Sequence, residues 1–122
     1  MKSISESTIT VCKEQLLRIK ANLLNRMREN HSDYHSHDRG GDEADLAANV
    51  LAEGTFLTVQ ERLRAQLLEV EVALAKIERG IYGICEETEE PIETERLLAI
   101  PWTRLSVEGA EIHEDLSKRY AK

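Results

Sequence analysis

The fold of this chain is decided by residues 42–79, which read DEADLAANVLAEGTFLTVQERLRAQLLEVEVALAKIER. Apolar residues recur in this stretch at spacings of three and four, at Phe56, Val59, Leu63, Leu67, Val70, Leu74 and Ile77. That spacing places them on one face of an α-helix, and such a seam is stable when it is buried against another helix. No proline interrupts the stretch, and Gly80 follows it, where helices commonly end in the left-handed conformation. The pattern predicts one long helix with a buried seam.

Residues 8–34 repeat the same spacing and are the expected partner of this helix. Their seam consists of Ile9, Cys12, Leu16, Ile19, Leu23, Met27 and Tyr34. The paired glycines at 40 and 41 mark a turn, and a short turn between two long helices makes them antiparallel neighbours. We therefore expect residues 1–79 to form a long antiparallel coiled-coil hairpin, with its tip near residues 35–47.

The pattern changes after Gly80. Short apolar segments at 81–85 and 97–102 flank an acidic stretch at 86–95, which favours one or two small hairpins. From Ser106 to Tyr120, apolar residues at Ile112, Leu116 and Tyr120 predict a short amphipathic helix. The fold class expected is mainly α, with a small globular head at residues 80–122 that ends in a C-terminal helix.

Composition excludes several classes of function. The net charge is −7 and the pI is about 5.1, so the chain repels phosphate backbones, and direct nucleic-acid binding is not expected. The more natural partner is a basic protein surface or a metal-bearing site. No stretch is long and apolar enough to span a membrane, and residues 1–7 do not form a secretory signal. The two distant cysteines favour a reducing cytoplasm, and we expect a monomer.

The tip of the predicted hairpin is acidic. Asp42, Glu43 and Asp45 fall in the first turn of the second helix, where carboxylates commonly cap unpaired N–H groups. Alternatively, the hairpin delivers these carboxylates to a partner. The two interpretations are compatible. Just before them lie groups that bind divalent metals, His31, Asp33, His35, His37 and Asp38. A turn lacks the supporting contacts that orient metal ligands, so we expect a solvated polar loop.

The head carries a family resemblance. The run Ile77-Glu78-x-Gly80-x-Tyr82-Gly83-x-Cys85, then Glu-Glu-x-x-Glu-Pro-Ile and Arg96-Leu-x-Ala-x-Pro101, resembles the DksA/TraR family of bacterial transcription regulators. The same register places the family's tip motif, Asp-x-x-Asp-x-Ala, on Asp42, Asp45 and Ala47. The resemblance covers about residues 8–120 and implies a helical hairpin, a zinc-finger head and a terminal helix.

The zinc site of that family is degenerate in this chain. The family pattern, Cys-x2-Cys-x17-Cys-x2-Cys, falls on Cys85, Thr88, Ser106 and Gly109, and only the first is a thiol. One thiolate cannot hold a structural zinc ion, so we expect no zinc. Hydroxyl hydrogen bonds from Thr88 and Ser106, together with apolar packing, would replace it, with the packing expected from Ile84, Ile92, Leu97, Trp102 and Leu105. Cys85 is either a redox sensor or a buried thiol, and we favour the second.

The resemblance implies a function without catalysis. Members of the family insert their hairpin into the secondary channel of RNA polymerase and alter the stability of open promoter complexes, which places Asp42, Asp45 and Ala47 near the polymerase active centre. Many act with the alarmone ppGpp in the stringent response. Among the corresponding basic positions, Arg62 and Arg96 match, whereas Ala65, Glu69, Ile100 and Ala110 do not, and Glu69 would repel the ligand. The sequence leaves ppGpp open as a co-regulator.

Two other functions remain as alternatives. One is a polymerase cleavage factor of the Gre type, which also presents an acidic tip but carries a different head. The other is a coiled-coil adaptor or homodimer that binds a different protein through its helices. An enzyme is not expected, because the sequence offers no nucleophile–base pair, no phosphate-binding loop and no usable metal cluster.

Overall fold

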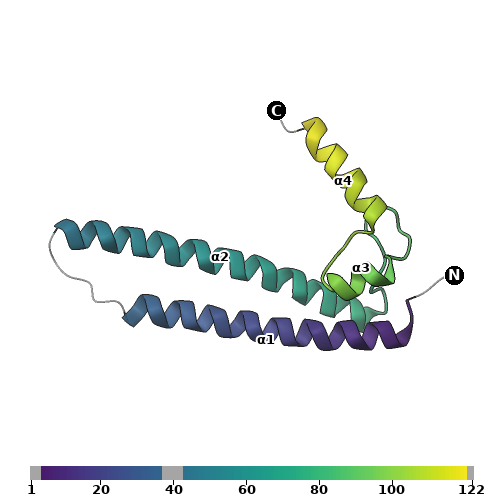
Figure 1. Ribbon diagram of the computed structural model, residues 1–122, viewed down its shortest axis with the longest axis horizontal. Coiled ribbons are helices and arrows are strands. Elements are labelled where there is room, and N and C mark those ends of the chain that lie inside the picture. Colours follow the sequence, from purple (N-terminus) through teal and green to yellow (C-terminus); the bar gives the residue numbers. More distant parts are fainter. Residues whose placement is uncertain (1–3, 37–42, 121–122) are drawn as a thin grey trace. The chain divides into compact units, whose positions relative to one another are not determined.

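The computed structural model describes residues 4–36 and 43–120. It contains the helices α1 (Glu6–Ser36), α2 (Glu43–Arg79), α3 (Thr94–Ala99) and α4 (Val107–Tyr120), as Figure 1 shows. Within the described ranges there is no β-strand, and the prediction of a mainly α fold with two long helices, a small head segment and a terminal helix is confirmed.

The chain folds into two compact units. One, here named the head unit, combines Met1–Arg18 with Glu69–Lys122, and the other, the hairpin unit, is Ile19–Leu68. Both long helices contribute residues to each unit. The domain boundary predicted between residues 79 and 80 stays a prediction.

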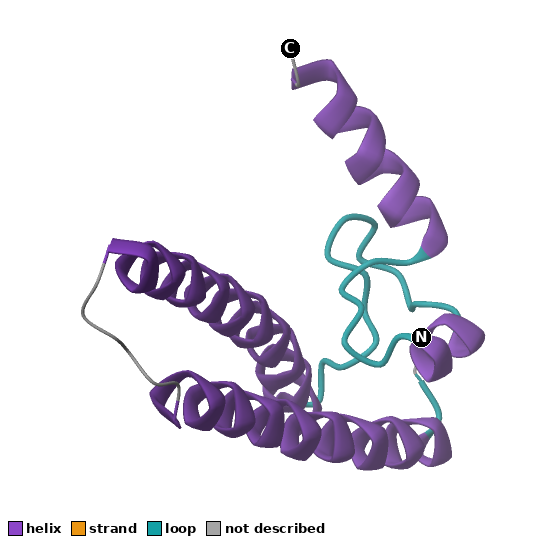
Figure 2. Cartoon of the chain, turned by 60° about the vertical axis from the view of Figure 1, so that its left-hand side comes forward, coloured by secondary structure: helices purple, strands orange, loops and turns teal. Residues whose placement is uncertain are grey.

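The hairpin unit is held together by the predicted seam. In this unit α1 and α2 lie side by side in both Figure 1 and Figure 2. Leu23 of α1 and Leu63 of α2 are almost completely buried. One polar residue interrupts the seam, since the Asn30 amide donates to the Phe56 carbonyl and to Gln60 Oε1, both at 3.2 Å. A polar pair inside an apolar seam favours one register over its neighbours, because any slip leaves the amide without partners.

The head unit has a small core drawn from α1, α2, α3 and the intervening loops. Its fully or almost fully buried residues are Cys12, Leu16, Val70, Ala73, Tyr82, Cys85, Ile92 and Leu97. The Cys12 thiol donates to the Leu97 carbonyl at 3.5 Å, and the Tyr82 hydroxyl donates to the Pro101 carbonyl at 2.8 Å. The first contact joins α1 to α3. The second joins the segment just after α2 to the segment just after α3. Cys12 and Cys85 are both free thiols.

The long helix α2 ends where its sequence predicts. Gly80 has φ +74°, and its N–H donates to the Ile77 carbonyl at 3.2 Å, while the Ile81 N–H donates to the Lys76 carbonyl at 3.0 Å. This pair of bonds is the Schellman arrangement, which satisfies the last carbonyls of a helix and needs a left-handed residue, usually glycine. The chain therefore turns from α2 directly into the loop that begins at Ile81.

The head loops differ from the predicted hairpins. Pairing is limited to one antiparallel bridge between Ile84 and Pro91, and the second apolar segment forms the short helix α3. Thr94–Ala99 contains Glu, Arg, two Leu and Ala, which are good helix formers, so local propensity favours a helix there. Trp102 was expected in the core but is 38% exposed. The α4 stripe of Ile112, Leu116 and Tyr120 is also exposed.

None of the described helices combines the length and apolarity that crossing a bilayer requires.

The seam makes a quantitative prediction. Leu63→Ala should lower the free energy of unfolding by about 2–5 kcal/mol, because Leu63 is only 2% exposed and its removal leaves a cavity. Leu68→Ala is the matched control on the same helix, and since Leu68 is 59% exposed it should change that free energy by less than about 1 kcal/mol. Urea denaturation followed by circular dichroism measures both, and equal losses would contradict the assigned seam.

Candidate functional site

The acidic tip begins at the first turn of α2. Asp45 and Ala47 are both exposed there, within the first five residues of a helix that starts at Glu43. Asp42, the other carboxylate of the predicted motif, lies outside the described residues, and so does the loop that contains His37 and Asp38. The charge of a carboxylate at a helix N-terminus is favoured by the helix dipole, and the exposed Asp45 occupies such a position.

Aromatic packing supports the tip end of the hairpin unit. The rings of Tyr34 and Phe56 stack with centroids 4.4 Å apart, which joins the last turn of α1 to α2. His31 and His35 lie beside this stack, with their own centroids 4.1 Å apart. In the part of the chain that the structure describes, no group of three or more His, Cys, Asp or Glu residues could hold a metal ion. His31 and His35 take part in ring packing, and the solvated character of the loop after them stays a prediction.

The four positions of the degenerate zinc site come together around one sulfur atom. The Thr88 N–H donates to Cys85 Sγ at 3.4 Å, and the Ser106 side chain also hydrogen-bonds the sulfur. Gly109 lies so close that a Cβ added there would overlap Cys85 Sγ. Burial raises the pKa of the Cys85 thiol, but the hydrogen bonds from Ser106 and Thr88 outweigh that effect and lower it to about 6. The sulfur thus acts as a hydrogen-bond acceptor at a buried position.

Ser106 and Thr88 shape the backbone around that sulfur. Ser106 precedes α4, and its hydroxyl accepts a hydrogen bond from the Gly109 N–H at 3.0 Å, as an N-cap residue does. The Glu93 carboxylate accepts from the Val107 N–H at 3.1 Å and so satisfies a second free donor of this helix. Thr88 Oγ1 accepts from the Glu90 N–H at 3.3 Å. The predicted hydroxyl hydrogen bonds are therefore present.

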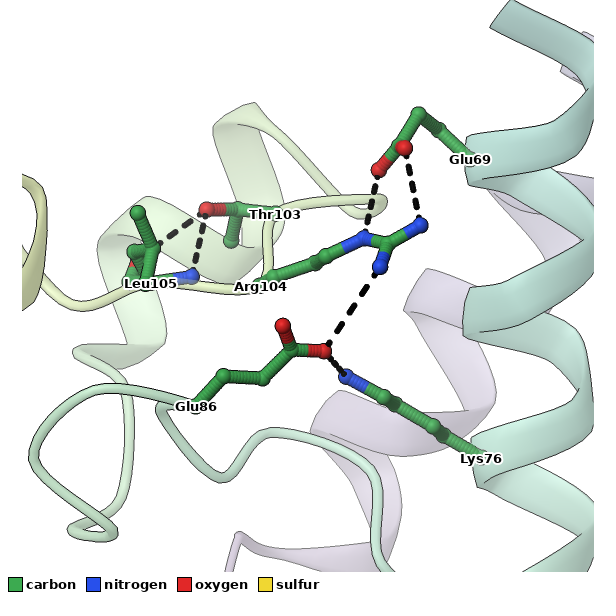
Figure 3. Close-up of polar contacts among 6 residues, drawn as sticks. All are labelled: Glu69, Lys76, Glu86, Thr103, Arg104 and Leu105. Carbon is green, nitrogen blue, oxygen red and sulfur yellow. Dashed lines mark hydrogen bonds and ion pairs between the residues drawn. The ribbon is translucent and has the colours of Figure 1, made fainter. Parts of the chain in front are cut away.

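A charge network, which the sequence did not indicate, ties the head loops to α2 (Figure 3). Arg104 makes a bidentate ion pair with Glu69, in which Nε and a terminal nitrogen each donate to one carboxylate oxygen at 2.8 Å. Glu86 accepts from Lys76 Nζ at 2.6 Å and lies 3.9 Å from Arg104. The Glu86 N–H also donates to the Arg104 carbonyl at 2.9 Å. The hydrogen bonds that Arg104 donates to Glu69 raise the pKa of Arg104 further above its usual range.

Both basic residues matched by the resemblance are described. Arg96 is half-buried, and its Nε donates to the Leu105 carbonyl at 2.7 Å, which joins α3 to the segment before α4. Glu93, three residues before Arg96, caps α4 through the Val107 N–H. Arg62 is exposed on α2 in the hairpin unit.

Comparisons with known proteins agree on one family. Residues 80–115 match the family described as prokaryotic dksA/traR C4-type zinc finger. An uncharacterized protein of Aquifex aeolicus is 35% identical over 124 aligned positions, covering 96% of this chain and 83% of the relative. The RNA polymerase-binding transcription factor DksA of Caulobacter vibrioides is 37% identical over 103 residues, covering 84% and 72%. The solved structure of transcription factor DksA2 from Pseudomonas aeruginosa superposes with a TM-score of 0.85 at 32% identity, covering 93% and 88%.

A C4 zinc finger does not fit the residues that this chain supplies. Such a site needs four thiolates in a tetrahedron at about 2.3 Å from the metal. The corresponding positions provide one thiol, two neutral hydroxyls and Gly109, which has no side-chain donor. The close approach of Gly109 to Cys85 Sγ also removes the space that a fourth ligand would need.

The environment of Cys85 predicts a pH-dependent stability. Its pKa falls from 9.0 to about 6 on folding, so the folded state binds fewer protons between these values. The free energy of unfolding should therefore rise as the pH is raised from about 6 to about 9, by up to about 1.4 kcal/mol per pH unit, and this contribution should be lost as the pH falls through 6. Chemical denaturation at a series of pH values measures it. Cys85→Ser should remove the slope and Cys12→Ala should keep it; the same slope in Cys85→Ser would refute the assignment.

The charge network predicts measurable coupling. In a double-mutant cycle, Glu69→Gln and Arg104→Met should show a coupling free energy of about 1 kcal/mol, because the pair is bidentate but about one-third exposed. The exposed pair of Glu114 and Lys118 on α4 is the matched control, and its coupling should stay below about 0.5 kcal/mol. Urea denaturation gives both values. Equal coupling in the two pairs would show that Arg104 does not hold the loop.

Proposed function

This chain belongs to the DksA/TraR family, and we propose that it is an RNA polymerase-binding transcription regulator whose helical hairpin enters the secondary channel of the enzyme. Its relative from Caulobacter vibrioides carries the name of an RNA polymerase-binding transcription factor, and that relative is 37% identical over 84% of this chain. We propose that the chain is not an enzyme, because its relatives are named as transcription factors and its sequence shows no nucleophile–base motif.

The observation that carries the proposal is the exposure of Asp45 and Ala47 in the first turns of α2. A helix start fixes the direction of the backbone that bears a carboxylate, so the charge can be delivered at a defined position. We propose that Asp45, together with Asp42, perturbs the polymerase active centre and its bound magnesium by charge and hydrogen bonding, while Ala47 packs closely against it. The outcome would be a changed lifetime of open promoter complexes.

We propose that the head folds without zinc and that the regulatory activity of the chain depends only weakly on ppGpp. One thiol at four ligand positions supports the first part. For the second, a polyphosphate needs several Arg or Lys side chains. Glu69 carries a negative charge at one of those positions and forms a bidentate pair with Arg104, while Arg96 Nε is engaged by the Leu105 carbonyl. Arg62 and Arg96 remain the proposed contacts to polymerase or ppGpp.

Other parts of the proposal follow from charge and composition. With a net charge of −7, the chain is proposed to reach promoters through polymerase rather than by binding nucleic acid itself. We propose that it acts as a monomer in the cytoplasm, where its two buried thiols stay reduced.

The tip is tested by removing one charge. Asp45→Asn should abolish the effect on open-complex lifetime while leaving folding and polymerase binding nearly unchanged, because Asp45 is exposed. Glu53→Gln is the matched control, since Glu53 is an exposed carboxylate on the same helix, and it should behave as the wild type. Promoter-complex lifetimes, measured with and without ppGpp, and a polymerase binding assay give the result. An Asp45→Asn variant with full activity would remove the basis of the tip mechanism.

Two alternative functions are outcomes of the same experiments. Stimulated cleavage of transcripts in stalled complexes would identify a Gre-like factor. Failure to bind polymerase, combined with a dimer in analytical ultracentrifugation, would identify a coiled-coil adaptor.

A further inference from the structure

A groove in the head unit is lined mainly by aliphatic side chains. It has a volume of about 510 Å³, within the range of pockets that bind ligands in proteins. Three separate segments supply the apolar lining, which consists of Ile4, Ile9, Ile77, Ile81, Ile84 and Pro91. Ile81 is 50% exposed, although a residue of this type is usually buried. The groove therefore leaves apolar surface in contact with water.

The wall that Ile4 forms is a built feature of the fold. Ile4 packs against Gly83, which has φ +85°, and a Cβ added at Gly83 would overlap the Ile4 side chain. Leu97 of α3 lies at the same point and is fully buried. The segment before α1 is thereby held against the loop that starts after α2, and this contact keeps one side of the groove in place.

Two carboxylates line the same groove. Glu89 and Glu90 are both exposed, and the structure gives neither side chain an ion pair within residues 4–36 and 43–120. Their neighbour Glu86 differs, because Lys76 and Arg104 neutralise it. No basic residue is among the described residues that line the groove. The charged side chains among the described residues that line the groove are therefore all negative.

The turn that carries these carboxylates is strained. Glu89 has φ +60°, a left-handed conformation that costs a non-glycine residue about 1–3 kcal/mol. The strain is held by the Glu89 N–H, which donates to the Cys85 carbonyl at 2.9 Å, and by the Cys85 N–H, which donates to the Glu90 carbonyl at 2.8 Å. Strained residues of this kind cluster at binding sites, where the surrounding structure maintains them.

We infer that this groove binds a short protein segment in which aliphatic side chains are flanked by lysine or arginine. The aliphatic side chains would fill the isoleucine-lined volume, and the cations would pair with Glu89 and Glu90. The match rests on charge complementarity, since an apolar groove with an uncompensated negative rim favours a basic apolar segment and repels an acidic one. This site is distinct from the acidic tip and does not depend on the proposed polymerase function.

The test uses the full chain and a set of fluorescein-labelled peptides. The probes are Lys-Leu-Ile-Arg-Lys and its variants with Val or Ile at the two apolar positions, and the controls are Lys-Ser-Ser-Arg-Lys and Glu-Leu-Ile-Glu-Glu. Fluorescence anisotropy should show saturable binding of the basic apolar probes and at least about tenfold weaker binding of both controls, which corresponds to about 1.4 kcal/mol. If none of the basic apolar probes binds saturably, or if the serine control binds as well as they do, the inference is wrong.

Variants of the chain locate the binding. The double variant Glu89→Gln/Glu90→Gln and the variant Ile81→Ser should each weaken binding by about tenfold or more. The matched controls are Glu87→Gln/Glu95→Gln, which removes the same charge outside the groove, and Leu98→Ser, which removes a comparably exposed leucine. Circular dichroism verifies that all variants fold. Equal weakening by the controls would indicate diffuse attraction, and a dimer that Ile81→Ser dissociates would assign the groove to a second copy of the chain; either result overturns the inference.

Discussion

Burial of the apolar seam shared by α1 and α2 is the interaction on which the other features depend. A helix with apolar residues every three to four positions is stable when that face is buried. Each leucine that it buries contributes about 1.5–3 kcal/mol to the free energy of folding. Leu16, Leu23, Leu63 and Val70 are almost completely buried along this seam. Asn30 adds a polar contact that selects the register. The stack of Tyr34 on Phe56 adds an aromatic contact between the last turn of α1 and α2.

The head unit is small, and the family to which the chain belongs is described as having a zinc finger in this region. A structural zinc ion supplies roughly 10–16 kcal/mol of apparent binding free energy in small domains. No single contact in this head replaces that amount. The buried core around Tyr82, Ile92 and Leu97, the hydrogen bonds to Cys85 Sγ and the ion pairs of Arg104 share the task. Because hydrogen bonds contribute only about 1 kcal/mol each, apolar burial has to supply most of the stability.

The charged residues of the head show how position decides what a carboxylate does. Glu69 and Glu86 neutralise Arg104 and Lys76, and Glu93 caps α4. Glu89 and Glu90, each three residues away in sequence from a glutamate with a partner, line an apolar groove. Residues 86–95 contain six glutamates that look alike in the sequence. In the folded chain Glu86 and Glu93 bind other residues of the head, whereas Glu89 and Glu90 lie at the groove.

The sequence by itself determined the two seams, the end of α2 at Gly80, the terminal helix and the family, because each of these is a local periodicity or a motif at fixed spacing. It also placed Cys85, Thr88, Ser106 and Gly109 together through the spacing of a lost metal site. The tertiary structure alone decided that Arg104 pairs with Glu69, 35 residues away, and that Trp102 stays partly exposed. Such outcomes depend on which loop packs against which helix, and no local pattern encodes a contact between side chains so far apart in the chain.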